Sequence, residues 1–168
     1  MLAIKINDIK TFMNQLLIGD TFDAFPMAEA SIAAFSTFSI DGRINKDFFD
    51  TDTQDILTRN GAIYSRWKDI KPFVRSIIRG KLLPLHLKVV FCLSESQLSV
   101  LTDSNIILST DTTGIQGYFL NIQYRNHTLL CTTGIARETF TMDKKPEQFW
   151  DELVLSFFRH LDIDFENL

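Results

Sequence analysis

Hydrophobic side chains recur at helical spacing near both ends of the chain. After Asp8, which is suited to cap a helix, apolar residues repeat every three to four positions until Gly19 provides a stop. Pro146 stands where proline favours the start of a helix, with Glu147 in the first turn. The first apolar stripe contains Ile9, Phe12, Met13, Leu16 and Leu17, and the second contains Phe149, Trp150, Leu153, Val154, Phe157, Phe158 and Leu161. Both stripes are predicted to be buried.

A third amphipathic helix is predicted at residues 66–79, before Gly80. Its apolar face would contain Trp67, Ile70, Phe73, Val74, Ile77 and Ile78. Pro72 conflicts with a continuous helix, because an internal proline removes a backbone hydrogen bond and clashes with the preceding turn. The pattern leaves two alternatives, a helix that begins near Lys71 or a separate turn around Trp67 that precedes it.

Alternation of apolar and polar residues predicts strands at residues 1–6 and 85–93 and a β-hairpin at 117–133. With a two-residue turn at Asn126 and His127, one face of the hairpin is apolar and the opposite face is largely polar. The predicted pairs are Tyr124 with Leu129, Ile122 with Cys131 and Leu120 with Thr133. Residues 135–142 fit a further strand.

A second hairpin is predicted at residues 28–49, because the Asp-Gly pair that ends at Gly42 is a frequent turn sequence. A three-residue loop at residues 40–42, with Gly42 in the left-handed conformation, would oppose Phe38 to Ile44 and keep one face apolar. We therefore expect the turn of this hairpin at Gly42.

The order of elements predicts the fold class. It reads strand, helix, two strands, a polar connector at residues 50–64, helix, strand, a short helix capped by Ser94 or Ser96, two or three strands and a final helix. Antiparallel hairpins with segregated amphipathic helices are typical of an α+β fold with one or two sheets. A length of 168 residues suits one domain, 1–168, with two halves joined near residues 50–64. The acidic tail after Leu161 is expected to fray.

Composition excludes several classes of protein. With 45% hydrophobic residues and fifteen phenylalanines, the chain can form a large core and is not disordered. No apolar run reaches the roughly 18–20 residues that span a bilayer, and the charged N-terminus does not match a signal peptide. Cys92 and Cys131 lie in apolar strands and are predicted to be buried thiols. We expect a cytoplasmic protein without a membrane partner.

The most informative feature is a local excess of positive charge. Residues 65–81 hold six basic residues against a single aspartate, a charge of +5 in a chain whose net charge is −4. At 100° per residue, one helix face would carry Lys68, Lys71, Arg75 and Arg79, opposite the apolar face. We predict that this basic stripe, within residues 66–81, binds an acidic macromolecule, either nucleic acid or protein. The alternative is the solvated face of an ordinary amphipathic helix.

Other candidate sites are less specific. Four aspartates, Asp47, Asp50, Asp52 and Asp55, could hold a divalent cation or could form a solvated, helix-capping turn. No cysteine and histidine spacing suits zinc, so no metal site is assigned. No phosphate-binding loop or dinucleotide fingerprint occurs, so no cofactor is predicted.

Three functional hypotheses follow from these observations. The first is a non-enzymatic binding or regulatory module that engages a macromolecule. The second is an enzyme whose acid, base or nucleophile comes from separated segments. No catalytic residue is assigned, because His86, His127 and His160 are far apart in the sequence and each suits a structural position. The third is a homo-oligomer or oligomeric structural protein held together by surplus apolar surface.

The segments FSIDGRINKDFF, GYFLNIQY, LLCTTG and EQFWDE resemble a family of bacterial proteins of similar length from Gram-positive anaerobes, a domain of unknown function. The resemblance extends over nearly the whole chain. It implies a bacterial cytosolic protein, and it transfers no catalytic residues.

Overall fold

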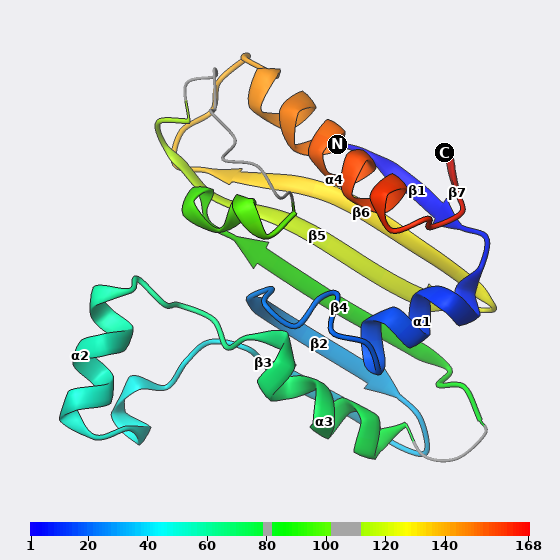
Figure 1. The fold of residues 1–168 in the computed structure, drawn as a ribbon, viewed down its shortest axis with the longest axis horizontal. Helices are drawn as coiled ribbons and strands as arrows, with labels where there is room; N and C mark the ends of the chain where they lie inside the picture. Colours follow the sequence, from blue (N-terminus) through cyan, green and yellow to red (C-terminus); the bar gives the residue numbers. More distant parts are fainter. Residues whose placement is uncertain (79–81, 102–111) are drawn as a thin grey trace.

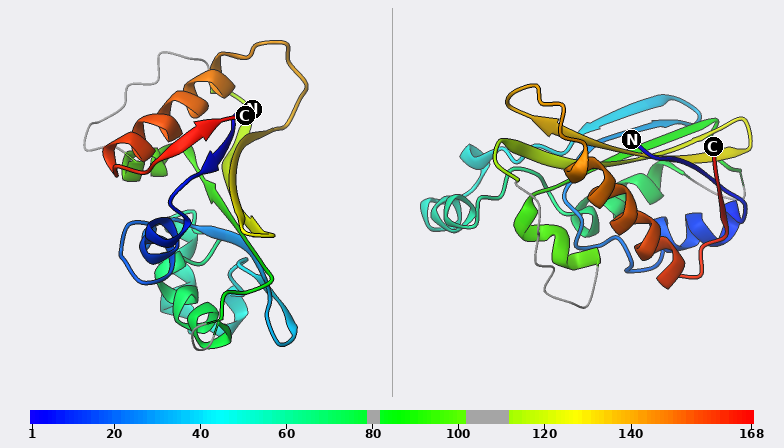
Figure 2. Two further views of the ribbon diagram at one scale, coloured as in Figure 1. Left: turned by 90° about the vertical axis from the view of Figure 1, so that its right-hand side faces the viewer. Right: turned by 90° about the horizontal axis from the view of Figure 1, so that it is seen from above.

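The computed structural model describes residues 1–78, 82–101 and 112–168, and they form an α+β fold (Figure 1). The described strands form one antiparallel sheet of seven strands in the order β3-β2-β4-β5-β6-β1-β7. The strands are β1 (Ala3–Ile6), β2 (Met27–Ala33), β3 (Thr37–Asp41), β4 (His86–Leu93), β5 (Ile115–Arg125), β6 (Thr128–Arg137) and β7 (Phe165–Asn167). The helices are α1 (Ile9–Leu17), α2 (Thr51–Arg59), α3 (Trp67–Ile77) and α4 (Lys145–His160), with 3-10 helices η1 (Lys46–Phe48) and η2 (Glu95–Leu101). Helices α1, α3 and α4 cover one face of the sheet (Figure 2).

The β5–β6 hairpin confirms the register predicted from the sequence. Leu120 pairs with Thr133, Ile122 with Cys131 and Tyr124 with Leu129. The turn residues Asn126 and His127 have φ values of 50° and 57°, and two consecutive positive φ values match the twist of the flanking strands. The predicted further strand after Gly134 is a continuation of β6 as far as Arg137.

The prediction of a turn at Gly42 is wrong. Strands β2 and β3 are joined by residues 34–36 instead, where the Ala34 N–H donates to the Ser36 carbonyl at 2.9 Å. Gly42 follows β3 and is not left-handed. Its backbone passes so close to β2 that a Cβ would lie 1.6 Å from the Met27 carbonyl oxygen. The glycine is therefore required by close backbone approach and not by turn geometry.

Helix α3 begins at Trp67 and continues through Pro72, so neither alternative offered by the sequence is right. Two hydrogen bonds fix this start. The Trp67 N–H donates to the Phe25 carbonyl at 2.8 Å, and the Trp67 indole Nε1 donates to the Leu16 carbonyl at 2.7 Å. Tertiary contacts at the first turn thus offset the backbone hydrogen bond that proline lacks.

Two segments that were expected to be irregular are ordered in the structure. The predicted connector at residues 50–64 contains α2, which is capped by Asp50. The tail, which was predicted to fray, contains β7, which pairs with β1 so that the termini lie side by side (Figures 1 and 2). Neither element has a periodic hydrophobic pattern, because α2 buries no residue and β7 has only three residues.

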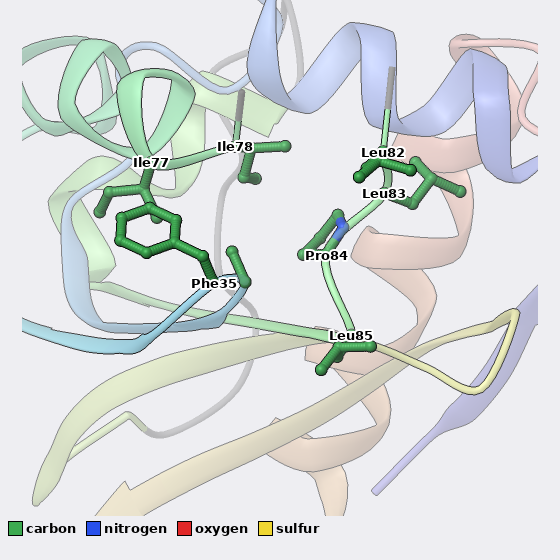
Figure 3. A pocket seen from close by; sticks show the side chains of 8 residues that line it. Phe35, Ile77, Ile78, Leu82, Leu83, Pro84 and Leu85 are labelled. Atoms are coloured by element: carbon green, nitrogen blue, oxygen red, sulfur yellow. The ribbon is translucent and has the colours of Figure 1, made fainter. Parts of the chain in front are cut away.

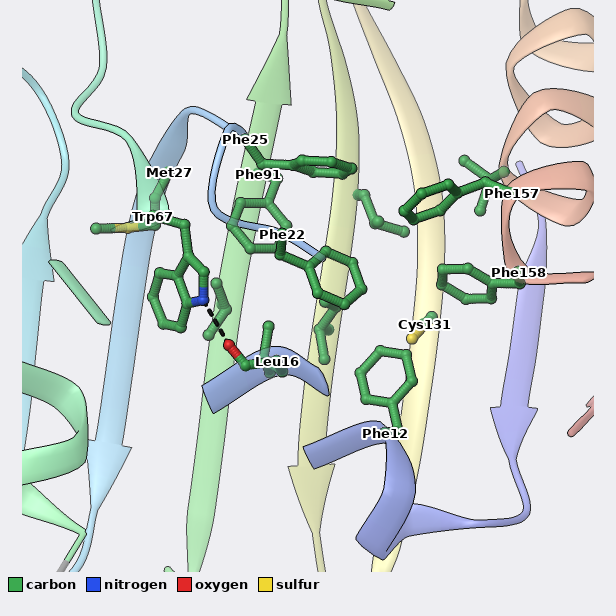
Figure 4. Close-up of a cluster of buried hydrophobic side chains, with 14 of the residues drawn as sticks. Phe12, Leu16, Phe22, Phe25, Met27, Trp67, Phe91, Cys131, Phe157 and Phe158 are labelled. Atoms are coloured by element: carbon green, nitrogen blue, oxygen red, sulfur yellow. Dashed lines mark hydrogen bonds between the residues drawn. The ribbon is translucent and has the colours of Figure 1, made fainter. Parts of the chain in front are cut away.

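The core lies between the sheet and helices α1, α3 and α4 (Figure 4). Trp150, Leu153, Phe157, Phe12 and Leu16 are buried, as their helical spacing predicts. The centre of the core is Phe22, from the loop between α1 and β2. Its ring centroid lies 5.3–5.9 Å from the nearest aromatic rings, which belong to Phe12, Phe25, Phe91 and Phe157. Short elements are thereby joined into a single aromatic cluster.

Among the residues that the structure describes, no helix covers the opposite face of the sheet (Figure 2). One row across it runs through Lys5, Leu130, Gln123, Lys88 and Ser31. Its charges are paired locally, since Lys5 contacts Glu166 at 2.7 Å and Lys88 contacts Glu29 at 2.9 Å. This face is an ordinary solvated side of an antiparallel sheet.

Candidate functional site

The basic stripe predicted on α3 does not exist as one exposed surface. Lys68 and Arg75 are exposed, whereas Lys71 is buried with 7% of its surface accessible. Arg79 lies outside the described residues. The prediction that Lys71 faces solvent beside the other basic residues is therefore wrong.

Lys71 is buried because its ammonium group has two partners in the loop between α1 and β2. The Nζ atom donates to the Gly19 carbonyl at 2.6 Å and forms an ion pair with Asp23. The aliphatic stem of a lysine can pack along apolar surface while its charged end reaches a polar partner. Lys71 consequently connects α3 to the α1–β2 loop and has a structural role.

The phase of α3 also differs from the prediction at Phe73. This ring was assigned to the buried face, yet 65% of its surface is exposed. The other members of the predicted apolar face are buried or pack against the core, as expected: Trp67, Ile70, Val74, Ile77 and Ile78. Lys71 is a further buried position of the helix, which the hydrophobic pattern did not indicate because lysine is charged.

An apolar hollow opens where α3 ends, with a volume of about 330 Å³ (Figure 3). Phe35 and Ile77 lie on one side of it, and Leu82, Leu83 and Pro84 lie on the other. The complete lining is Ala34, Phe35, Ile77, Ile78, Leu82, Leu83, Pro84 and Leu85. Four of its large side chains are mostly exposed, Leu82 at 82%, Phe35 at 79%, Leu85 at 74% and Leu83 at 57%.

A second depression of about 360 Å³ adjoins this apolar hollow toward α1 and shares several of its residues. Arg75 and Ile18 line it, so a cation stands beside the apolar surface. The sequence signal for this region is the run of leucines around Pro84, which precedes β4. The sequence analysis placed Leu85 in the predicted strand and assigned no role to Leu82 and Leu83. Exposed apolar side chains around a hollow bordered by positive charge are suited to bind a ligand that has both apolar and acidic groups.

A more polar pocket of about 260 Å³ lies where β4, β5 and β6 meet the segment after α2. Its lining includes Arg43, Tyr64, Gln97, Gln116 and Cys92. Burial raises the pKa of the Cys92 thiol to about 11, so the group stays protonated and is a poor nucleophile at neutral pH. Burial also raises the pKa of Cys131, and both cysteines are free, as the sequence predicts.

The aspartate cluster has a local explanation. Asp50 is the N-cap of α2, and its carboxylate accepts a hydrogen bond from the Thr53 N–H at 2.8 Å. Hydrogen bonding to the Thr53 side chain, and then to its N–H, lowers the pKa of Asp50. Within the described residues, no group of three or more histidine, cysteine, aspartate or glutamate side chains is arranged to hold a metal ion. The helix-capping interpretation fits Asp50.

The three histidines also occupy positions with local explanations. The ring of His86 lies 3.2 Å from the Gln123 side-chain amide, and His127 fills a left-handed turn position. His160 is exposed in the last turn of α4, where a positive charge is favourable.

In the part of the chain that the structure describes, no helix is long and apolar enough to cross a bilayer.

A family model described as "Family of unknown function (DUF5721)" matches residues 15–166. The chain belongs to this family. The matched range begins within α1 and includes all of α2, α3 and α4, so it contains both the apolar hollow and the polar pocket. The resemblance drawn from the sequence to a domain of unknown function is thus confirmed. Comparison with curated proteins and with solved structures gave no significant match.

Proposed function

We propose that this protein is a non-enzymatic binding module that holds an acidic, apolar-faced protein segment in the apolar hollow at the end of α3. The observation that carries the proposal is the gathering of Phe35, Leu82, Leu83 and Leu85 around the hollow with most of their surface exposed. Single exposed apolar residues are common on monomers, whereas a group around a concavity is typical of an interaction site.

Burial of these side chains by a partner would supply the binding energy. A large aliphatic or aromatic side chain contributes about 1.5–3 kcal/mol when it passes from exposed to fully buried, before the entropic cost of association. Four such residues line the hollow and are only partly covered in the isolated chain. Their combined contribution is compatible with a specific complex of moderate affinity.

Charge favours an acidic protein partner over nucleic acid. Arg75 lines the depression that adjoins the hollow, and Lys68 is exposed about two turns earlier in α3. Nucleic acid is held mainly by several lysine or arginine contacts to phosphates, and burial of Lys71 removes one of the residues that would have supplied them. An apolar wall beside a cation suits an apolar side chain followed by a carboxylate. A reducing cytoplasm would suit the two buried thiols, and we include that location in the proposal.

Labelled helical peptides would test the proposal. Two peptides with the same apolar face, one carrying acidic and the other basic polar residues, are held at nanomolar concentration and titrated with increasing amounts of the protein while fluorescence anisotropy is measured. We expect the acidic peptide to bind at least tenfold more tightly and to weaken as salt screens Arg75. Leu85→Asp should abolish binding, and Arg75→Glu should reverse the preference for charge.

Lys145→Glu is a matched control. It replaces a positive charge by a negative one, as Arg75→Glu does. Lys145 is exposed at the start of α4, which lies at the far end of the molecule from the hollow (Figure 1). It should leave the affinity for both peptides within about twofold. If neither peptide binds, or if Leu85→Asp binds as the wild type does, the docking proposal is wrong. Preferential binding of an oligonucleotide that is lost in Arg75→Glu would instead favour the nucleic-acid interpretation.

A further inference from the structure

A second surface of this chain has the chemistry that the hollow is proposed to bind. Residues 44–63, here called the arm, leave the body of the protein and contain η1 and α2 (Figure 1). The arm is closed at its base by the Ile44 N–H, which donates to the Ile63 carbonyl at 2.9 Å. Neither η1 nor α2 has a buried residue.

The arm exposes apolar side chains on η1 and α2, here called the arm tip. Phe48 is 84% exposed and Ile56 is 51% exposed. The Phe48 ring contacts a neighbour in the same arm, with its centroid 5.3 Å from that of Phe49. A nine-residue helix is too short to be stable by itself in water, and most helices gain their stability by packing an apolar face. The tip therefore has the properties of a surface that is covered in the functional state.

The charge of the arm is opposite to that of the rim of the hollow. The arm contains two basic residues and four aspartates, Asp47, Asp50, Asp52 and Asp55, for a net charge of −2. The walls of the hollow are apolar, and Arg75 lines the adjoining depression, which shares Leu82, Leu83 and Pro84 with the hollow. A cation therefore lies at the rim of the hollow. Apolar groups beside carboxylates on one surface thus match apolar groups beside a cation on the other.

The arm of one chain points away from its own hollow. The arm joins the body next to the first turn of α3, whereas the hollow opens at the last turn of that helix (Figures 1 and 3). Eleven helical residues separate the two ends, a distance of about 16 Å at 1.5 Å per residue. The two matching surfaces can therefore meet only between different copies.

We propose that the hollow of one copy holds the arm tip of a second copy, and that the exchange is reciprocal in a two-fold symmetric dimer. This inference rests on the proposed function, because it names the segment that the hollow binds. In such a dimer each contact between arm and hollow is made twice. Phe48 and Ile56 would be covered by the aliphatic wall, and aspartates of the arm would neutralise Arg75.

Mixed cysteine variants test this arrangement directly. One variant carries Ile56→Cys in the arm, and the other carries Leu85→Cys in the hollow, both at exposed positions. An equimolar mixture under mild oxidation should give a disulfide-linked heterodimer, seen on a non-reducing gel, while each variant alone should give little. The native Cys92 and Cys131 are buried and should not take part. Ile56→Cys mixed with Ser156→Cys, at an exposed position on α4, is the control for random collision.

Sedimentation equilibrium of the full chain gives the second readout. Wild type should be a dimer at micromolar concentration, and Phe48→Asp should raise the dissociation constant at least tenfold without unfolding the chain, since Phe48 is exposed in one copy. A monomeric wild type, or a mixture that cross-links no more than the control, would overturn the inference. If acidic peptides still bind the hollow in that case, the proposed function stands with another partner. If they do not, both proposals fail.

Discussion

Lys71 provides the sharpest test of the structure, because the sequence and the fold assign it opposite roles. As a member of an exposed stripe, Lys71 would tolerate substitution, and exposed charges typically change stability by less than about 0.5 kcal/mol. In the structure its side chain is 9% exposed and meets Asp23 and the Gly19 carbonyl. Lys71→Met keeps the apolar stem and removes both interactions.

The expected cost of Lys71→Met follows from those contacts. A hydrogen bond from a charged donor contributes about 1.5–3 kcal/mol, and two are lost. Asp23 keeps 26% of its side-chain surface accessible, so water compensates for part of the loss. We expect the free energy of unfolding to fall by about 2–4 kcal/mol. With a urea slope of about 1–3 kcal/mol/M, the midpoint should move by on the order of 1–2 M.

Urea unfolding followed by tryptophan fluorescence is a suitable assay, since Trp67 and Trp150 are both fully buried. Lys68→Met, at an exposed position in the same helix, is the matched control and should leave the midpoint almost unchanged. Adding Asp23→Asn to Lys71→Met should cost less than the sum of the two single changes, because the residues are in contact. Equal midpoints for Lys71→Met and wild type would refute the assignment of Lys71 as a buried structural residue.

Two further predictions concern backbone packing and the thiols. Gly42→Ala should destabilise the protein by about 3 kcal/mol, at the upper end for overpacking, because the new Cβ would overlap the backbone of Met27. Gly134→Ala, where a Cβ meets nothing within 4 Å, is the control, and equal urea midpoints for the two variants would contradict the close approach. Both thiols should resist a disulfide reagent at pH 8 and react fully once urea unfolds the chain, whereas rapid labelling of the native protein would contradict their burial. Because burial raises the pKa of Cys92 from 9.0 to about 11, its contribution to stability is complete below pH 9 and should be lost as the pH rises from 9 to 11.

The sequence by itself determined those features whose signal is local and repeated. The stripes that contain Phe12 and Phe157 predicted α1 and α4, because a buried helix face recurs every three to four residues. Alternation along β5 and β6, with Asn126 and His127 between them, predicted even the pairing of the strands. These features also placed the fold in the α+β class.

Only the tertiary structure decided the features that depend on contact between distant segments. Gly42 looked like a turn residue, and its real constraint is the backbone of β2, which no local pattern reveals. Lys71 looked like part of a solvated face, and its burial depends on Asp23, 48 residues away in the chain. The apolar hollow likewise combines the β2–β3 turn, the end of α3 and the segment before β4. Residues that are unremarkable in sequence become a site when folding brings them together, because side-chain burial and charge pairing are set by neighbours in space.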